Sequence, residues 1–316
     1  MRRGKDIQQA LMSKARHPSR LKRTWELMAL SRPLSADYEL RSGSIAAMAA
    51  ALFIMVFAGE GLAQALGGAD KPSAIATLLK WLPLILFGTL HVHIVDGALA
   101  VTGQLGGFAL NILVSVVVMA AGTVLGVAMG LVLVSPSKIA RRSASLITQF
   151  FRNTPWLVLL FFAVLLLPFR IHIFGFSVPF PDWAKASVAL TFPIMANVGE
   201  ITRGAIQSIP TTQWDSAESL ALSRLQSFRF VILPQCVKRM TPPWMNWFAI
   251  LMMESSLISI VGVNEAMTLT NDALAAESRS ELLIPMYGML LALFFAFCYP
   301  IARWTRSIEK RFEVLN

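Results

Sequence analysis

Long apolar blocks separated by short polar stretches dominate the chain from residue 44 onward. A membrane-spanning helix needs about 20 mostly apolar residues to cross about 30 Å of hydrocarbon. Six blocks meet that requirement, at 44–66, 107–134, 154–175, 184–206, 244–263 and 284–304. A seventh block, 74–99, contains Lys80, Pro83, His91, His93 and Asp96, which are too many polar groups for a helix facing lipid. The pattern therefore predicts an all-α integral membrane protein with about six transmembrane helices.

The composition supports this interpretation and excludes several other classes. Of the 316 residues, 55% are hydrophobic and 15% are charged, whereas soluble domains carry roughly 25% charged residues. The net charge of +10 does not indicate nucleic-acid binding, because the charges lie between apolar blocks and form no single basic face. Two cysteines, Cys236 and Cys298, exclude a disulfide framework, and no CxxC or Cys/His cluster indicates zinc.

The basic residues in the loops predict the orientation. If the N-terminus is cytoplasmic and 74–99 does not cross, the inside pieces contain 23 of the 28 Lys and Arg residues. An excess of Lys and Arg in cytoplasmic loops is the rule for membrane proteins. Both termini are therefore expected in the cytoplasm. The inside pieces are 1–43, 135–153, 203–243 and 303–316, and the outside pieces are 67–106, 169–185 and 264–283.

The first hundred residues are expected to form three parts. Residues 1–43 carry ten Lys and Arg residues and predict a basic cytoplasmic arm that is attracted to anionic lipid. Such an arm is too long for the basic region of a cleaved signal peptide, so 44–66 is interpreted as an uncleaved transmembrane helix. Residues 67–106 are expected to lie outside or at the membrane interface.

A ladder of glycines marks the second span, at Gly122, Gly126 and Gly130. Residues four apart lie on one helical face, and small residues let two helix backbones approach closely in lipid. This face is expected to pack within one subunit, with a contact between subunits as the alternative.

The polar stretch between the fourth and fifth spans predicts two short helices. Thr212 with Asp215 and Ser223 with Gln226 follow the spacing of a capping box, in which two side chains cap the start of a helix. Pro234 is expected to end the second helix. The predicted bend lies around residues 221–223, and Trp214, Ala217, Leu220 and Ala221 place small and apolar groups on one side of the first helix. Such a knob could dock another protein or pack on its own bundle.

This stretch resembles the EAA loop in permease subunits of binding-protein-dependent ABC importers. That motif runs Glu-Ala-Ala, three residues, Gly, about nine residues, and then Ile-x-Leu-Pro. The corresponding residues here are Asp215-Ser216-Ala217, then Ala221, then Ile232-Leu233-Pro234. The family glycine is replaced by Ala221, and alanine does not adopt a positive φ as readily as glycine, so the geometry of the bend is in question.

Other segments extend the resemblance over roughly 105–313, to the polar amino acid permeases. Residues 151–155 read FRNTP, residues 200–210 read EITRGAIQSIP, and residues 254–257 read ESSL, each similar to a motif of that subfamily. The resemblance implies a five-helix permease domain over 107–313, with a coupling loop at about 208–240, preceded by one additional N-terminal helix.

The resemblance also implies partners. In this family two permease subunits pair as a homodimer or a heterodimer. Two ATP-binding subunits dock on their loops, and an extracytoplasmic solute-binding protein delivers a small solute. ATP and Mg would be bound by the ATP-binding subunits, and no cofactor or metal by this chain, which lacks a GxxxxGK[ST] loop and is not expected to be an enzyme. The location is the bacterial inner membrane. The residues implied in ATPase coupling are Asp215, Ser216, Ala217, Glu218, Leu220, Ala221, Ser223, Leu233 and Pro234.

Ionisable and polar groups within spans are candidates for the solute pathway, because an ionised group at the bilayer centre needs a partner or water. Glu254, with Ser255 and Ser256, and separately Asn197, are the candidates. For Glu254 the alternative is a structural hydrogen bond or an inter-subunit pair. Glu200 and Arg203, three residues apart on one helix, are expected to form a local ion pair or a gate contact.

Three other classes of protein remain as alternatives. An ion-coupled secondary transporter should show inverted repeats or broken helices, a membrane enzyme should show paired acidic or histidine motifs, and an assembly protein would leave the loop unexplained. Amino acids or related solutes such as opines are the expected cargo, and the sequence does not choose among them.

Overall fold

The computed structural model describes residues 73–313, apart from 90, 96–97 and 174–175. The predicted basic arm at 1–43 and the predicted first span at 44–66 lie outside the described residues. The described chain is mainly helical. Two antiparallel hairpins are the exception to the all-α prediction: β1 (His91–Val95) pairs with β2 (Ala98–Thr102), and β3 (Arg170–Ile173) pairs with β4 (Phe176–Pro179).

Among the described residues, three helices are long and apolar enough to cross a membrane, or four if a bent pair counts as one span. The three are α5 (Gly107–Leu133), the continuous segment Arg224–Val261, and the segment Ser280–Glu309, which comprises the 3-10 helix η3 (Ser280–Leu282) and most of α13 (Leu283–Glu313). The segment Arg224–Val261 comprises α10 (Arg224–Gln226), the π-helix η1 (Ser227–Ile232), α11 (Leu233–Glu254) and the 3-10 helix η2 (Ser255–Val261). Helix α8 (Asp182–Gln207) has 26 residues but is less apolar.

The prediction of a single helix over 154–175 is wrong. The structure instead has α6 (Lys138–Asn153) followed by α7 (Trp156–Leu166), with a bend of 101° between them. Thr154 and Pro155 adopt extended backbone angles at the break, because proline lacks the N–H donor and disfavours the helical conformation of the residue before it. The residues that follow form the β3–β4 hairpin, and the predicted inside piece 135–153 is mostly helix α6.

The glycine ladder packs α5 directly against α8. A Cβ placed on Gly122, Gly126 or Gly130 would come within 2.5 Å of Ile194 Cγ2, 2.6 Å of Val198 Cβ and 2.4 Å of Thr202 Cβ, respectively. The expectation of packing within one subunit is confirmed. This seam continues into a core formed by α5, α7, α8, α11 and η2.

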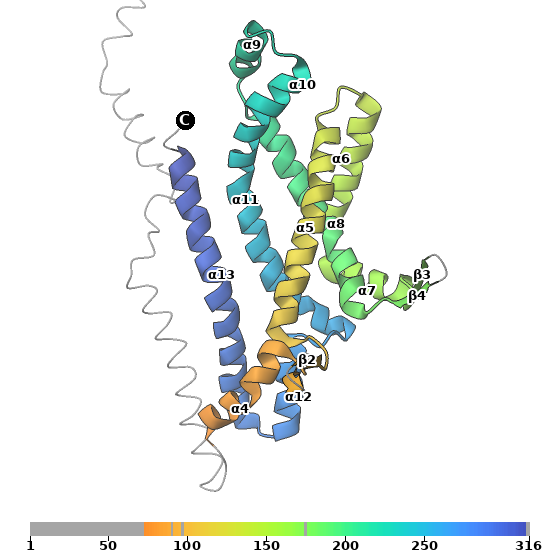
Figure 1. Ribbon diagram of the computed structural model, residues 1–316, viewed down its shortest axis with the longest axis vertical. Helices are drawn as coiled ribbons and strands as arrows, with labels where there is room; N and C mark the ends of the chain where they lie inside the picture. Colours follow the sequence, from red (N-terminus) through yellow and green to blue (C-terminus); the bar gives the residue numbers. More distant parts are fainter. Residues whose placement is uncertain (1–72, 90, 96–97, 174–175, 314–316) are drawn as a thin grey trace, which may run out of the picture. The chain divides into compact units, whose positions relative to one another are not determined.

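A second core lies at the start of α5, where α4 (Ala74–Phe87) and α12 (Ala266–Glu277) pack against α5 and α13. In Figure 1 this group lies at the opposite end of the helices from α9 (Thr211–Ser219) and α10. We call these two ends the α12 end and the loop end. Residues 74–99 therefore form a 14-residue helix and part of a hairpin, and no single spanning helix.

Candidate functional site

The loop end is built by α9, a turn, α10, η1 and the first residues of α11. Helix α9 begins at Thr211 with Pro210 at its N-cap and no side-chain cap, so the capping box predicted at Thr212 is wrong. The box at Ser223 is confirmed: Ser223 Oγ accepts from Gln226 N at 3.4 Å, and Gln226 Oε1 accepts from Ser223 N at 2.8 Å.

Pro234 does not end the second helix, contrary to the prediction. The π-helix η1 runs directly into α11, and Pro234 occupies the first turn of α11. Because η1 and α11 are continuous, Pro234 removes one backbone hydrogen bond from the segment, and it directly follows the π-helical turn. The result is one continuous segment that joins the loop to a membrane-spanning helix.

Ala221 occupies the position of the family glycine and adopts φ of +54°. Alanine in the left-handed region costs roughly 1–2 kcal/mol, so the turn is held by other interactions. Leu222 N donates to Ala217 O, and Ala221 N donates to Glu218 O at 2.8 Å. The bend is thus retained without the glycine.

The interior of the loop is apolar and belongs to its own chain. Ala217 is 2% exposed, and Trp214 packs against a cluster that includes Ile209, Ile232 and Cys236. Ala217 therefore packs inside the loop and does not reach a docking face. Ser216 is exposed, and its hydroxyl donates to Thr212 O at 2.7 Å.

The exterior of the loop carries exposed apolar side chains next to carboxylates. Leu220 is 74% exposed, Leu225 76% and Phe230 65%. Asp215 and Glu218 are exposed as well. We call these five residues the docking surface. Leu233 and Pro234, also exposed, continue it toward α11.

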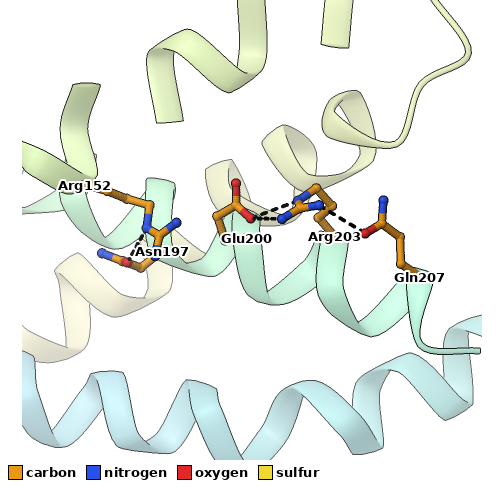
Figure 2. Close-up of polar contacts among 5 residues, drawn as sticks. All are labelled: Arg152, Asn197, Glu200, Arg203 and Gln207. Carbon is orange, nitrogen blue, oxygen red and sulfur yellow. Dashed lines mark hydrogen bonds and ion pairs between the residues drawn. The ribbon is translucent and has the colours of Figure 1, made fainter. Parts of the chain in front are cut away.

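A polar cavity of about 430 Å³ lies between the end of α6, the C-terminal half of α8 and α11. Arg152 Nε donates to Asn197 Oδ1 at 3.1 Å, and Asn197 Nδ2 donates to Pro193 O at 2.8 Å. Figure 2 shows these side chains in line with Glu200 and Arg203 along α8. Residues lining the cavity include Arg152, Asn197, Glu200, Ser208, Arg239, Pro243 and Trp247.

Glu200 and Arg203 form the local ion pair that their spacing predicts. Arg203 Nη2 lies 2.6 Å from Glu200 Oε2, and Arg203 Nε donates to the same oxygen at 2.8 Å. Arg203 Nη1 also donates to Gln207 Oε1 at 3.1 Å. Both contacts to Glu200 end on Oε2, so among the described residues Oε1 accepts no hydrogen bond. It is available to a ligand.

The other pathway candidates lie elsewhere. Ser255 is fully buried, donates to Met252 O and accepts from Asn111 Nδ2 at 3.0 Å, so it is part of a structural network. Ser256 donates to Met253 O and borders a different, mostly apolar cavity beside α13. Glu254 is half-buried at the end of α11, and its carboxylate contacts no hydrogen-bond donor among the described residues.

The network around Ser255 joins α5 to the start of α12. Asn111 Nδ2 also donates to Glu265 Oε2 at 3.0 Å, and Asn111 Oδ1 accepts from Ala266 N at 3.2 Å. Glu265 Oε1 caps α12 by accepting from Thr268 N at 2.9 Å. Asn111 and Glu265 are fully buried, and burial raises the pKa of the Glu265 carboxyl.

The sequence did not indicate three residues of these sites: Arg152, Asn111 and Glu265. Arg152 lies in the FRNTP segment, which was used only for the resemblance. In the part of the chain that the structure describes, no group of three His, Cys, Asp or Glu side chains is placed to hold a metal ion, and Cys236 and Cys298 are free thiols.

Comparison with known proteins shows the family of the chain. The family model for the binding-protein-dependent transport system inner membrane component matches residues 122–314. The probable amino-acid ABC transporter permease protein YckA of Bacillus subtilis is 32% identical over 209 residues, which are 65% of this chain and 87% of the relative. The glutamine transport system permease protein GlnP of Escherichia coli is 26% identical over 66% of this chain and 92% of the relative.

The fold is also similar to a solved structure, that of an amino acid ABC transporter crystallised with histidines. The TM-score is 0.54 at 24% identity, over 64% of this chain and 90% of the other. At that identity the likeness concerns the fold. With the family model matching more than half of the chain, this protein belongs to the family of binding-protein-dependent transport system inner membrane components.

Proposed function

We propose that this chain is the permease subunit of an ATP-driven importer for amino acids in the bacterial inner membrane, with both termini in the cytoplasm. It would pair with itself or with a second permease. Two ATP-binding subunits would dock on the loops, and an extracytoplasmic binding protein would deliver the solute. The observation that carries the proposal is the docking surface: Leu220, Leu225 and Phe230 are each at least 65% exposed on a loop continuous with a spanning helix.

Coupling would be mechanical. ATP binding draws the ATP-binding subunits together, and each displaces the loop docked in it. Because η1 continues into α11 without a break, a displacement of the loop acts directly on a helix that borders the polar cavity. The exposed carboxylates of Asp215 and Glu218 would face basic residues of the ATP-binding subunit. Hydrolysis then returns the bundle to its inward-open state.

The polar cavity supports amino acids as the class of solute. An amino acid carries a carboxylate and an ammonium on one carbon, so its site needs a cation and an anion a few ångströms apart. The Arg152 guanidinium uses only Nε for Asn197 and can bind the carboxylate bidentately. Glu200 Oε1 can accept from the ammonium. Opines carry the same two groups, so the cavity does not distinguish opines from amino acids.

Binding of an ATP-binding subunit provides the first test. Co-purification from membranes with the tagged chain is expected to recover that subunit, and Leu225→Asp should abolish recovery because it places a charge in the apolar part of the docking surface. Lys238→Gln, exposed on α11 beyond that surface, should recover it normally. Full recovery with Leu225→Asp, or none with the unaltered chain, would contradict the proposed docking and favour a secondary transporter or an assembly protein.

Transport kinetics test the cavity. Arg152→Gln is expected to raise the KM for amino-acid uptake by at least about tenfold, because a charge-assisted hydrogen bond contributes roughly 1.5–3 kcal/mol. Arg142→Gln, an exposed arginine of the same helix, should leave KM unchanged. An unchanged KM in Arg152→Gln, with the protein folded, would show that the solute binds elsewhere. Glu254 would then be the next candidate for the solute site.

A further inference from the structure

Helix α4 lies before the residues that the family model matches and is apolar on both of its faces. Its inner face, with Ala74, Leu78 and Ile85 at most 7% exposed, packs against α12 and α13. Its outer face carries Ala76, Leu79, Pro83 and Phe87, which recur at the spacing of one helical stripe. Leu79 is 63% exposed and Phe87 is 52% exposed. A helix facing water would carry polar side chains there.

Lys80, the charged residue of α4, is paired with a residue of the same chain. Lys80 Nζ lies 2.7 Å from Glu277 Oε1 on α12 and 4.8 Å from the centre of the Trp81 ring. Trp81 Nε1 donates to the same Glu277 oxygen at 2.8 Å. These two hydrogen bonds lower the pKa of the Glu277 carboxyl, which keeps the contact ionised. Lysine and tryptophan side chains gather at the boundary between lipid and water.

The length and place of α4 indicate how it meets the bilayer. Its 14 residues extend about 21 Å at 1.5 Å per residue, too short for the roughly 30 Å of hydrocarbon. It contacts α5, α12 and α13 at the α12 end (Figure 1), where α5 and α13 begin. Gly88, with φ of +71°, and the bond from Gly106 N to Phe87 O then return the chain to the start of α5.

We propose that α4 is an interfacial membrane anchor in the leaflet opposite the coupling loop. Leu79 and Phe87 insert among lipid acyl chains, while Lys80 and Trp81 hold Glu277 of α12 at the level of the headgroups. The lipid is chosen over a protein partner because α4 contacts the spanning helices α5 and α13 where they begin, and because the charge of Lys80 is already paired within the chain. The anchor fixes α12 to the bilayer while α11 moves. This inference requires a membrane protein and is independent of the solute.

Spin-label accessibility in liposomes tests the anchor. The full chain, with Cys236→Ala and Cys298→Ala, receives single cysteines at Leu79, Phe87, buried Leu78 or exposed Thr89, and is reconstituted in phosphatidylethanolamine and phosphatidylglycerol. We expect labels at 79 and 87 to collide more often with oxygen, which concentrates in hydrocarbon, than with a water-soluble nickel chelate. The label at 89 should show the reverse, and the label at 78 should be protected from both.

Two outcomes would overturn the anchor. Preferential collision with the nickel chelate at 79 and 87 would show that the stripe faces water. Protection from both reagents would show that protein covers it, for example a second permease or another part of this chain. Because 79 and 87 are exposed, labels there should not disturb folding. Circular dichroism and an unchanged gel-filtration profile verify this, and neither depends on transport.

Discussion

The α12 end of the helix bundle buries a polar network, whereas the loop end exposes apolar side chains. At the α12 end, Asn111, Ser255 and Glu265 are fully buried and satisfy one another with hydrogen bonds. At the loop end, Leu220, Leu225 and Phe230 are exposed, as are the carboxylates of Asp215 and Glu218. A buried polar network stabilises one arrangement of helices, whereas exposed apolar groups on a loop are typical of a binding surface. The buried polar groups of the α12 end are thus satisfied within the chain, and the loop end presents the surface for which we propose a partner.

The largest expected loss of stability comes from the buried network. Glu265→Ala removes the cap of α12 and one of the two acceptors of the Asn111 amide, so that one buried N–H is left unsatisfied. We expect the free energy of unfolding to fall by about 3 kcal/mol, from a lost cap and an unsatisfied buried donor. Thermal unfolding in detergent measures this. Glu309→Ala, near the end of α13, is the control, and an equal melting temperature for Glu265→Ala and the unaltered chain would contradict the assigned role.

A smaller change in stability, of opposite sign, is expected at the bend around Ala221. Ala221→Gly should raise the free energy of unfolding by about 1 kcal/mol, since glycine adopts positive φ without the penalty that alanine carries. Ser278, the other described non-glycine residue with positive φ, at 53°, provides a matched site at the α12 end. Ser278→Gly should raise the free energy of unfolding by less, because it also loses the hydrogen bond from Ser278 Oγ to Ala275 O. Destabilisation by Ala221→Gly would show that the bend is not strained.

A weak, pH-dependent effect is expected where α4 meets α12. The pKa of Glu277 is lowered in the folded protein by hydrogen bonds from Lys80 and Trp81, so its contribution to stability is present above its ordinary pKa of about 4.3. That contribution is lost as the pH falls through the lowered value. Lys80→Met should therefore cost at most about 1 kcal/mol at neutral pH, because Lys80 is largely exposed.

Melting temperatures of Lys80→Met and the unaltered chain, measured from neutral pH down to pH 3, provide the check. The difference should shrink as the pH falls. A difference that grows in acid would mean that Lys80 acts other than through the Glu277 carboxylate.

The smallest effect on folding is expected at the docking surface. Leu225→Ser should change the free energy of unfolding by less than about 0.5 kcal/mol, as is usual for exposed positions. It should nevertheless weaken co-purification of the ATP-binding subunit. A bulky charged replacement at Ala221, such as Ala221→Glu, should likewise uncouple ATP turnover from uptake. If Leu225→Ser unfolded the chain, Leu225 would be a packing residue and the contrast between the two ends would fail.

The sequence predicted the features that depend on neighbouring residues. The glycine ladder indicated close packing because its spacing follows one helical face, and the Ser223 capping box and the Glu200–Arg203 pair each lie within one helical turn. The Asn111–Glu265 contact joins residues 154 positions apart, and a lone asparagine in a span has no pattern that indicates its partner. Arg152 and Asn197, 45 positions apart, were missed as a pair for the same reason.

Errors arose where one residue has two possible roles. The Thr154–Pro155 step was interpreted as the start of a span, but it separates α6 from α7, because a proline can begin one helix and end another. Pro234 was expected to end a helix, but it lies in the first turn of α11. At Ala221 the substitution for glycine did not change the turn, since hydrogen bonds from the residues around it maintain the positive φ.

Uptake by proteoliposomes tests the central claim most directly. The chain is reconstituted with its candidate ATP-binding subunit, its binding protein and, where needed, a second permease, with ATP supplied on the side of the loop. Radiolabelled amino acid should accumulate only with ATP and with the ATP-binding subunit, and Leu225→Asp should abolish accumulation. Accumulation without the ATP-binding subunit, or at the full rate with Leu225→Asp, would contradict the account.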